Sequence, residues 1–348
     1  MLICDNKSGY SPERLFALAS RENNKKRGGL IVNFLQAKHV PAAPADTLAL
    51  FDRLAEIVAD GISEKKVMVI GFAETATAIG AELAARLSDK CDCTYIHTTR
   101  EKFPEEMRLA LFNEEHSHAV EQCLFSDKGL SLFDGIERII FAEDELTTGK
   151  TILNFINALK NTVNCKFSAA SIINGMSGEN ISVYDEIGAD LFRLVKTDSS
   201  AKVLEQAMEV IPEEDGYFDI DSIPEELTMR MSAEYDPRLG IDGGEYEKYC
   251  ESFVRQEFER MKPYLTGSTV DVIGTEECMY PAIKLAEYLN SKGYKALCHA
   301  TTRSPIVPSR AEGYPLFSRY RVRSVYDDER RTFIYNLYEC DHRIKVIG

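Results

Sequence analysis

The strongest chemical signal in the sequence is a run of acidic, hydroxyl-bearing and glycine residues directly after an apolar segment. Residues 138–142 read Arg-Ile-Ile-Phe-Ala, and two adjacent carboxylates, Glu143 and Asp144, follow them. Two residues later the chain runs into a helical pattern through Thr147, Thr148, Gly149, Lys150 and Thr151. Backbone N–H groups at a helix start, together with threonine hydroxyls, can enclose a phosphate monoester. The carboxylates can accept hydrogen bonds from the two hydroxyls of a ribose and can stabilise positive charge that develops on its ring.

The same run partly matches the P-loop of nucleotide triphosphatases, because Gly149, Lys150 and Thr151 reproduce the end of that motif. The P-loop also requires a glycine at position 144, with four residues between it and Gly149. Position 144 is Asp, and an aspartate facing the β-phosphate would repel it. The sequence therefore excludes the triphosphatase interpretation.

The complete pattern is four apolar residues, two acids, two variable residues and Thr-Thr-Gly-Lys-Thr. It resembles the motif with which type I phosphoribosyltransferases bind 5-phosphoribosyl 1-pyrophosphate (PRPP). The acidic pair departs from that motif only by Glu instead of Asp at position 143, which the family tolerates. The resemblance implies that residues 143, 144 and 147–151 bind PRPP, and that Glu143 and Asp144 are also catalytic. Mg²⁺ is then the expected cofactor, carried by PRPP near the two carboxylates rather than held by protein ligands of its own.

In that family a second loop, after an earlier strand, contacts the pyrophosphate. The matching segment follows the apolar run at 67–70, and its candidate residues are Phe72, Ala73, Glu74 and Thr75. Glu74 is unusual, because a carboxylate near pyrophosphate requires a magnesium ion or an outward rotamer. A plain strand–helix turn is the alternative interpretation.

The family also has a mobile loop that closes over PRPP during turnover, and residues 99–123 occupy its place. Arg100 and Lys102 can neutralise pyrophosphate oxygens as the leaving group departs. His116 and His118 are titratable groups near the point where a proton must move. These four are candidate catalytic residues; solvated loop positions, or a metal-binding H-x-H pair with no obvious third ligand, are the alternatives for the histidines.

A basic, amide-rich stretch near the N-terminus corresponds to the hood with which the resembled family recognises its acceptor. Its candidate acceptor-binding residues are Arg21, Asn23, Asn24, Lys26, Arg27, Lys38 and His39. Such a stretch suits an acceptor that carries a carboxylate or a phosphate. A solvated basic face is the alternative.

The elements around these motifs alternate between short apolar strands and amphipathic helices. Strands are expected at 67–73, 94–97, 138–142, 167–174 and 189–195. Because they are apolar on both faces, they predict a mostly parallel sheet covered by helices. The expected fold class is therefore α/β, of the type I phosphoribosyltransferase kind: a Rossmann-like parallel sheet with a hood, plus a second, smaller α/β lobe.

The chain is long for a single hydrophobic core, so more than one domain is expected. Residues 1–196 are the expected phosphoribosyltransferase-like domain. The acidic, proline-punctuated stretch 197–235 is the expected connector, and residues 236–348 are the expected second α/β domain.

The second domain contains a faint internal echo of the first, at a constant offset of 203 residues. Val-Met-Val-Ile-Gly at 67–71 corresponds to Val-Asp-Val-Ile-Gly at 270–274, and the Thr-Thr-Arg that begins at 98 corresponds to the one that begins at 301. General similarity among αβ units is one interpretation. The other is that each half presents a strand end to a phosphate-bearing ligand. On that interpretation the anion-binding residues of the second lobe are Thr301, Thr302, Arg303 and Ser304.

Residues 302–305 read Thr-Arg-Ser-Pro. Together with the segment 323–341, they resemble the TRSP domain, which lies C-terminal to a phosphoribosyltransferase-like domain in proteins encoded near tellurium-resistance genes. The resemblance implies a place in a nucleoside-like biosynthetic pathway and does not supply the reaction.

Composition limits the partners. Lys and Arg number 41 against 56 Asp and Glu, and the resulting formal charge of −15 argues against a nucleic-acid backbone as the main ligand. The apolar runs are too short to span a bilayer, and the first residues lack a signal-peptide pattern. Nine cysteines without a C-x-x-C pair predict reduced thiols in the cytoplasm and argue against a zinc site.

We therefore expect an Mg²⁺-dependent phosphoribosyltransferase, a glycosyltransferase that acts on PRPP and an unidentified base-like acceptor, or runs in reverse on a 5′-mononucleotide. Two alternatives stay open: a PRPP-sensing regulator without catalysis, and a bifunctional enzyme whose C-terminal lobe processes the product. The partners are then PRPP or a 5′-mononucleotide and a small-molecule acceptor, with a homodimer also open.

Overall fold

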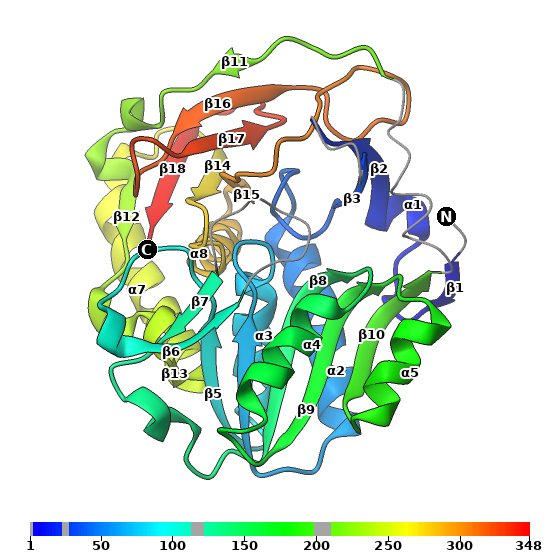
Figure 1. Ribbon diagram of the computed structural model, residues 1–348. Coiled ribbons are helices and arrows are strands. Elements are labelled where there is room, and N and C mark those ends of the chain that lie inside the picture. The colour runs from blue at the N-terminus through cyan, green and yellow to red at the C-terminus, as the bar shows by residue number, and fades with distance from the viewer. Residues whose placement is uncertain (1–2, 23–27, 113–121, 198–209) are drawn as a thin grey trace. The chain divides into compact units, whose positions relative to one another are not determined.

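The computed structural model describes residues 3–22, 28–112, 122–197 and 210–348 (Figure 1). These residues form two compact units, each assembled from three separate stretches of chain. Unit 1 takes its residues from Met1–Ser8, Phe51–Ala201 and Ala233–Tyr249, and unit 2 from Gly9–Leu50, Lys202–Ser232 and Cys250–Gly348. Within the described stretches, no helix is both long and apolar enough to cross a membrane.

Unit 1 is built on a seven-stranded sheet that is mostly parallel. In spatial order its strands are β1 (Ile3–Asn6), β10 (Asp190–Thr197), β9 (Lys166–Asn174), β8 (Arg138–Leu146), β4 (Lys66–Gly71), β5 (Asp92–His97) and β13 (Ile241–Asp242). The five central strands are parallel, and the edge strands β1 and β13 run antiparallel to their neighbours. β4, β8 and β9 are largely buried, because their Val, Ile, Phe and Ala residues are apolar on both faces. The predicted α/β fold with a parallel sheet is confirmed.

Helices and one hairpin complete unit 1. α3 (Thr77–Leu87) packs against β4 and β5, α4 (Lys150–Leu159) follows β8, and α5 (Gly178–Glu186) packs against β10. The segment expected to be a mobile loop at 99–123 contributes instead to a hairpin formed by β6 (Arg108–Phe112) and β7 (Gln122–Phe125). Two longer helices, α2 (Pro44–Gly61) and α7 (Gly243–Met261), contribute residues to both units.

Unit 2 contains a parallel four-stranded sheet, whose order is β12 (Thr228–Arg230), β18 (His342–Ile347), β14 (Thr269–Gly274) and β15 (Lys295–Ala300). The helix α8 (Tyr280–Ser291) packs against β14 and β15. A second sheet joins β11 (Gly216–Tyr217), β16 (Arg319–Arg323) and β17 (Arg331–Tyr335). The predicted second α/β lobe is therefore present as a parallel sheet with its own helix.

An N-terminal hairpin is part of unit 2. After the short helix α1 (Pro12–Leu15), strands β2 (Phe16–Ser20) and β3 (Gly29–Asn33) pair antiparallel. Their apolar residues share one buried cluster with residues from the last 45 positions of the chain, namely Ala19, Leu30, Val32, Ile306, Tyr314, Leu316, Phe333 and Tyr335. The hood segment expected in the first domain is thus packed into the unit that contains the C-terminal sheet.

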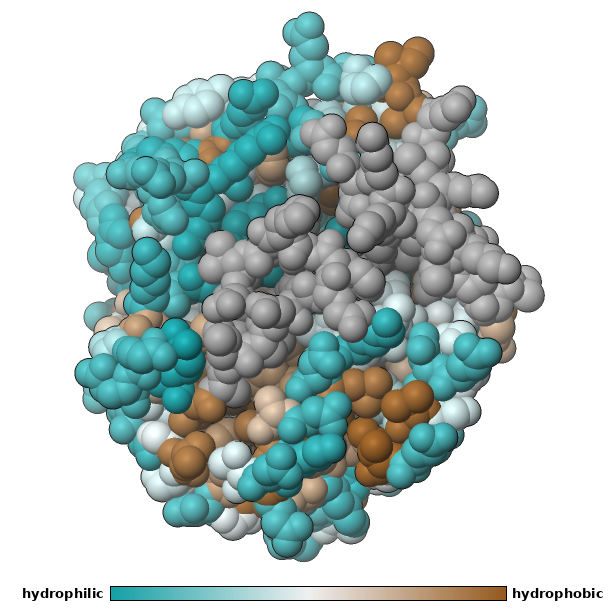
Figure 2. All heavy atoms as spheres, in the orientation of Figure 1, coloured by the Kyte–Doolittle hydropathy of each residue, from teal (hydrophilic) through white to brown (hydrophobic). Residues whose placement is uncertain are grey.

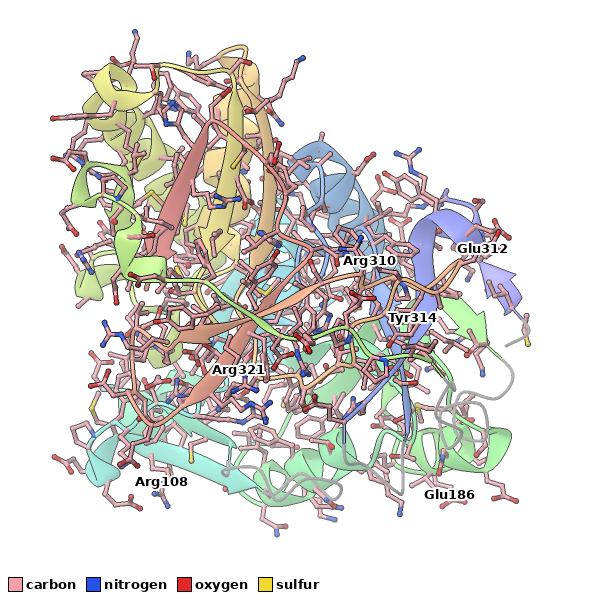
Figure 3. All side chains as sticks on the ribbon, turned by 90° about the horizontal axis from the view of Figure 1, so that it is seen from above. Arg108, Glu186, Arg310, Glu312, Tyr314 and Arg321 are labelled. Carbon is pink, nitrogen blue, oxygen red and sulfur yellow. The ribbon has the colours of Figure 1, made fainter. Side chains whose placement is uncertain are left out.

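The acidic stretch expected to be a connector lies along the arginine-rich strand β16. Asp215 pairs with Arg319 at 2.6 Å and with Arg321 at 2.9 Å, and Glu213 pairs with Arg310 at 3.3 Å. Arg310 and Arg321 are labelled in Figure 3. Burial favours the neutral form of Asp215, but the hydrogen bonds from the two arginines outweigh it and lower its pKa. Hydrophilic side chains cover much of the upper left of the face shown in Figure 2.

The predicted 203-residue echo is a structural repeat. Adding 203 to the bounds of β4 gives those of β14, and adding it to the bounds of β5 gives those of β15. The helices α3 and α8 also begin at equivalent positions, Thr77 and Tyr280. Lys66 on β4 pairs with Asp92 on β5, and the equivalent Thr269 on β14 pairs with Lys295 on β15, so the register of the strand pair is repeated as well. Each unit therefore contains one copy of the same β–α–β element.

Candidate active site

The sheet order of unit 1 brings three of the predicted segments to one edge. β4 lies between β5 and β8, and all three strands are parallel. Their carboxyl ends therefore meet on the same side of the sheet, where α/β proteins bind ligands. The segments that follow them are the predicted pyrophosphate loop after β4, the Arg100–Lys102 segment after β5, and the predicted PRPP loop at the end of β8.

The acidic pair belongs to the strand itself, because β8 extends to Leu146 rather than ending at Ala142. Pairing with β4 stops at Ala142, whereas pairing with β9 continues through Glu143 opposite Ser171 and Glu145 opposite Ile173. Both carboxylates are half-buried. The backbone N–H of Asp144 donates to Glu143 Oε1 at 3.2 Å, and that of Glu145 donates to Asp144 Oδ1 at 2.8 Å. Rigid strand backbone thus positions both acids beyond the last residue of β4.

The threonine-rich turn leads directly into α4. Gly149 has the left-handed φ of 72° and serves as the N-cap residue, and α4 begins at Lys150. Gly149 has no side chain with which to cap the helix, and the backbone N–H of Lys150 donates to Thr148 Oγ1 at 3.4 Å. The first-turn N–H groups of an α-helix have no partner within the helix. Thr147, Thr148 and Thr151 are half-buried beside it, and Lys150 is exposed. This arrangement is suited to an anion.

Tyr184 on α5 holds this turn, and no sequence motif indicated it. Its hydroxyl donates to the carbonyl oxygen of Gly149 at 2.6 Å, and its side chain is fully buried. A Cβ atom at position 149 would lie 2.8 Å from the Tyr184 ring and 2.9 Å from Met176 Cε. Burial raises the pKa of Tyr184, so its hydroxyl remains a donor at neutral pH. Gly149 is therefore required both by its φ and by the close approach of Tyr184.

The predicted pyrophosphate loop is largely enclosed. Phe72 is buried against the rings of Phe141 and Phe155, each with its centroid 6.1 Å away, so its side chain belongs to the core. The backbone N–H of Ala73 donates to Thr98 Oγ1 at 2.9 Å. Glu74 is only 6% exposed, Thr75 is half-buried, and the peptide bond between Ala73 and Glu74 is cis.

The segment after β5 begins buried and becomes exposed. Thr98 and Thr99 are fully buried, and Thr99 pairs with Cys123 through backbone hydrogen bonds of 2.9 and 3.0 Å. Arg100 is half-buried and Lys102 is exposed. His116 and His118 lie outside the described residues.

His97, the last residue of β5, is a buried group that the sequence did not single out. Burial lowers its pKa to about 4, and the nearby guanidinium of Arg238 acts in the same direction. Its ring is therefore neutral at physiological pH. Arg238 comes from the stretch Ala233–Tyr249, which is far downstream in the sequence but belongs to unit 1.

The predicted hood residues are distributed differently from the expectation. Lys38 is fully buried in unit 2, where its ammonium donates to the carbonyl oxygens of Glu276 at 3.2 Å and Thr301 at 3.3 Å. His39 is buried against the ring of Tyr335. Arg21 is half-buried and, with Arg319 and Arg331, lines a cavity of about 1060 Å³ in that unit. Asn23, Asn24, Lys26 and Arg27 lie outside the described residues.

In the second lobe, the repeat extends to individual hydrogen bonds. Thr98 Oγ1 accepts the N–H of Ala73, and Thr301 Oγ1 accepts the N–H of Glu276 at 3.0 Å. In the next position, Thr99 Oγ1 accepts the N–H of Glu101 at 3.0 Å and Thr302 Oγ1 accepts that of Ser304 at 3.2 Å. Both threonine hydroxyls of the second lobe thus hold loop backbone, as their counterparts do in unit 1. Arg303 and Ser304 are the half-buried members of the predicted anion site.

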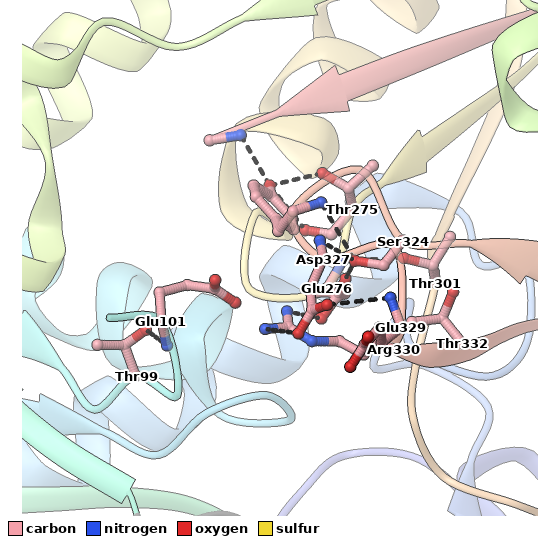
Figure 4. Close-up of polar contacts among 12 residues, drawn as sticks. Thr99, Glu101, Thr275, Glu276, Thr301, Ser324, Asp327, Glu329, Arg330 and Thr332 are labelled. Carbon is pink, nitrogen blue, oxygen red and sulfur yellow. Dashed lines mark hydrogen bonds and ion pairs between the residues drawn. The ribbon is translucent and has the colours of Figure 1, made fainter. Parts of the chain in front are cut away.

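The second copy has a buried carboxylate at a loop position where the first has an alanine. Glu276 stands where unit 1 has Ala73, and its side chain accepts hydrogen bonds from Ser324 Oγ at 2.5 Å and Arg330 Nη1 at 2.7 Å (Figure 4). Beside it, the Thr275 and Tyr326 hydroxyls lie 2.7 Å apart. An internal ion pair therefore occupies the space next to the second loop. Among the residues that the structure describes, no group of three or more His, Cys, Asp or Glu side chains is arranged to hold a metal ion.

Two family models match the chain. Residues 15–203 match the phosphoribosyl transferase model, and residues 235–346 match the model of the TRSP domain, which is described as lying C-terminal to it. No curated protein sequence matches the chain.

Solved structures with similar folds include three phosphoribosyltransferases. Adenine phosphoribosyl transferase from Trypanosoma brucei is 11% identical, with 52% of this chain and 76% of that chain covered and a TM-score of 0.37. The enzyme from Giardia lamblia is 13% identical, with 53% and 94% covered and a TM-score of 0.35. Orotate phosphoribosyltransferase from Mycobacterium tuberculosis is 16% identical, with 44% and 73% covered and a TM-score of 0.28.

The first family match covers more than half of the 348 residues, including the whole edge of the sheet described above. It is followed in the chain by the domain that accompanies this family. The chain therefore belongs to the phosphoribosyl transferase family and carries a C-terminal TRSP domain.

Proposed function

We propose that unit 1 binds PRPP at the carboxyl edge of β4, β5 and β8 and transfers its ribose 5-phosphate to a base-like acceptor, or catalyses the reverse pyrophosphorolysis. The observation that carries the proposal is the turn at residues 147–151. Its threonine hydroxyls and the start of α4, where the N-cap residue is a glycine, provide a phosphate cradle directly after two half-buried carboxylates. The carboxylates sit on strand backbone and the threonine turn leads directly into a helix, which favours precise positioning of the ligand.

In this mechanism the bond between the anomeric carbon and the pyrophosphate oxygen breaks, and the electron pair leaves with pyrophosphate. A lone pair of the acceptor then forms the new bond to the anomeric carbon.

The 5-phosphate is held by Thr147, Thr148 and Thr151 together with the N–H groups of the helix start. Glu143 and Asp144 accept hydrogen bonds from the ribose hydroxyls and stabilise the positive charge on the ring. Arg100 and Lys102 stabilise the negative charge on the departing pyrophosphate, and His116 and His118 remain the candidate groups for proton transfer.

The carboxylates also fit the proposed cofactor. Mg²⁺ is bound in proteins through one or two carboxylates together with substrate phosphates and waters. Glu143 and Asp144 are half-buried neighbours at the proposed ribose position and would hold the ion with PRPP. Bound there, Mg²⁺ would neutralise part of the pyrophosphate charge.

We further propose that the reaction belongs to a cytoplasmic, nucleoside-like biosynthetic pathway associated with tellurium-resistance genes, which is what the resemblance to the TRSP domain implies. The roles of Arg21 in acceptor binding and of Arg303 and Ser304 in a second-lobe anion site remain part of the proposal. Because Lys38 and His39 are buried in unit 2, we assign them to packing around the second-lobe loops.

The test is a calorimetric titration of the full chain with PRPP in the presence of Mg²⁺, comparing wild type with the Asp144→Asn, Thr148→Ala double variant. Asparagine keeps the Oδ1 acceptor for the N–H of Glu145, so the strand end is preserved while the charge is removed. The control is Asp185→Asn with Thr162→Ala, which changes the same residue types at exposed positions of unit 1.

We expect micromolar binding by wild type and the control, and none by the Asp144 variant. A wild type that is folded but binds neither PRPP nor a 5′-mononucleotide would refute the proposal. Binding without pyrophosphate release for any base tested would favour the PRPP-sensing regulator. A stoichiometry of two PRPP per chain would indicate a functional second-lobe site.

A further inference from the structure

The TRSP match begins at residue 235, and its first residues lie in the stretch Ala233–Tyr249, which belongs to unit 1. β13 adds an antiparallel strand to the outer edge of β5, with Ile241 opposite Tyr95 and Asp242 opposite Thr94. The first turns of α7 follow, where Tyr246 lies against the ring of Tyr95 at 5.8 Å. The last strand before the Arg100–Lys102 segment is therefore covered by residues from about 150 positions downstream.

The same stretch also contacts the segment that begins at Thr99. The guanidinium carbon of Arg238 lies 5.5 Å from the ring centroid of Phe103, within the range of a cation–π interaction. The ring of Phe103 in turn lies 5.2 Å from that of the buried Phe125. Ser126 directly follows Phe125 in the chain, and its Oγ donates to the carbonyl oxygen of Leu239 at 2.9 Å.

Arg238 is itself held in place. Its Nε donates to both carboxylate oxygens of Asp236, at 2.7 and 3.0 Å, and its backbone N–H donates to Oδ1 of the same side chain at 2.9 Å. The side chains are only 19% and 9% exposed. A paired, mostly enclosed guanidinium of this kind keeps a single rotamer, so the face it offers to Phe103 is fixed.

We propose that Arg238, oriented by Asp236, is a positioning residue for phosphoribosyl transfer: it holds Phe103 and thereby the adjacent Arg100–Lys102 segment at the edge where pyrophosphate leaves. Phe103 directly follows Lys102 in the chain, so its anchoring limits where that lysine can reach. The catalytic part of this inference rests on the proposed function, while the anchoring itself stands on the contacts described above. It also explains why the TRSP domain accompanies the family: its first residues support the transferase unit.

The test compares Arg238→Ala, Arg238→Lys, Phe103→Leu and Phe103→Tyr in the full chain, with Arg53→Ala as the control. Arg53 pairs with Glu56 on the exposed side of unit 1, so its loss removes a salt-bridged arginine away from the segment. Two readouts are taken: hydrogen exchange of the amides of residues 100–108, and steady-state pyrophosphate release with kcat and the KM for PRPP separated.

We expect faster exchange over 100–108 in Arg238→Ala and Phe103→Leu, an intermediate rate in Arg238→Lys, and wild-type rates in Phe103→Tyr and Arg53→Ala. With an active wild type, kcat should fall roughly 10- to 100-fold in Arg238→Ala and Phe103→Leu with little change in KM, because displaced catalytic groups cost rate more than binding.

Unchanged exchange in both Arg238→Ala and Phe103→Leu overturns the inference whether or not the chain is active. If Arg238→Ala fails to fold, the comparison of Phe103→Leu with Phe103→Tyr decides. A wild type that releases no pyrophosphate counts against the proposed function alone.

Discussion

At the scale of single residues, the proposed active site at the sheet edge of unit 1 depends on buried groups that the sequence motif does not contain. Tyr184 fixes the carbonyl of Gly149, Arg238 lies against Phe103, and His97 ends β5 with a neutral, buried ring. None of these positions has a spacing that relates it to the acidic pair or to the threonine turn. Their side chains reach the site only because strands and helices from separate parts of the chain pack together.

His97 makes a prediction about pH. Its pKa is about 4 in the folded chain, against about 6.5 for an unperturbed histidine. Between these values the unfolded state binds more protons than the native state, so stability rises with pH and is complete above about 6.5. Lowering the pH from 7 to 5 should therefore cost unit 1 about 2 kcal/mol through this group.

The measurement is the free energy of urea unfolding at pH 7 and pH 5 for wild type and His97→Asn. The variant should lose about 2 kcal/mol less than wild type over this interval, because it no longer carries the group that must bind a proton on unfolding. Equal losses in the two proteins would contradict a buried neutral imidazole at this position.

At the scale of elements, the start of α4 is the feature on which the proposed PRPP binding depends most directly. The turn needs a left-handed residue at position 149 and space for the Tyr184 ring. Replacing Gly149 by alanine imposes both the cost of a positive φ and a Cβ within 2.8 Å of Tyr184. The ring of a fully buried tyrosine has little room to retreat.

We predict that Gly149→Ala lowers the thermal midpoint and weakens PRPP binding at least tenfold, since it disturbs the backbone that forms the phosphate cradle. A matched control is Gly188→Ala, where φ is 67° but no atom lies within 4 Å of the added Cβ. That control carries only the backbone strain, about 1 kcal/mol, and should bind PRPP normally. Equal effects of the two substitutions on PRPP binding would show that Tyr184 does not constrain the turn.

The repeated β–α–β element shows how one backbone arrangement can be retained while its chemistry changes. Threonines at 98 and 301 close equivalent loops with equivalent hydrogen bonds. In unit 2, however, the residue equivalent to Ala73 is Glu276, which is paired with Arg330 and Ser324. The element therefore has a structural role in both units, and the second loop has acquired a buried ion pair of its own.

At the scale of the whole molecule, neither family-matched segment contains a complete folding unit. The hairpin of β2 and β3 lies within residues 15–203 but buries Leu30 and Val32 against Ile306 and Phe333. Conversely, β13 lies within residues 235–346 but pairs with β5. The linear division into domains at 1–196 and 236–348 stays a prediction, and expressing the parts separately tests it.

We predict that residues 1–203 expressed alone are much less stable than the full chain and do not bind PRPP. The hairpin would expose apolar side chains that are normally buried, at about 25 cal/mol per Å² of exposed apolar surface, and β5 would become an open sheet edge. The measurements are circular dichroism on heating and a PRPP titration. Restoration of binding by co-expression with residues 204–348 would support the interleaved arrangement. A segment 1–203 that melts at the temperature of the full chain and binds PRPP would show that the linear division is sufficient.

The sequence by itself determined the alternation of strands and helices, the family, and the 203-residue echo, and it supplied the prediction that residues 143–151 bind PRPP. These features are local: apolar runs specify strands over five to nine residues, and a ligand loop needs its donors and acceptors close together along the chain. The length of β8 was underestimated, because Glu143 and Asp144 lack strand propensity and continue the strand only through their pairing with β9.

Tertiary structure alone decided where the predicted hood residues lie and what contacts the segment proposed to be catalytic. Lys38 and His39 have the composition of a ligand-binding stretch, yet long-range packing buries them in unit 2. Arg238 has no local signal, yet it contacts a segment more than 130 residues earlier in the chain. Contacts of this kind depend on which surfaces complement one another after the elements have formed, and periodicity and motif spacing contain no information about that choice.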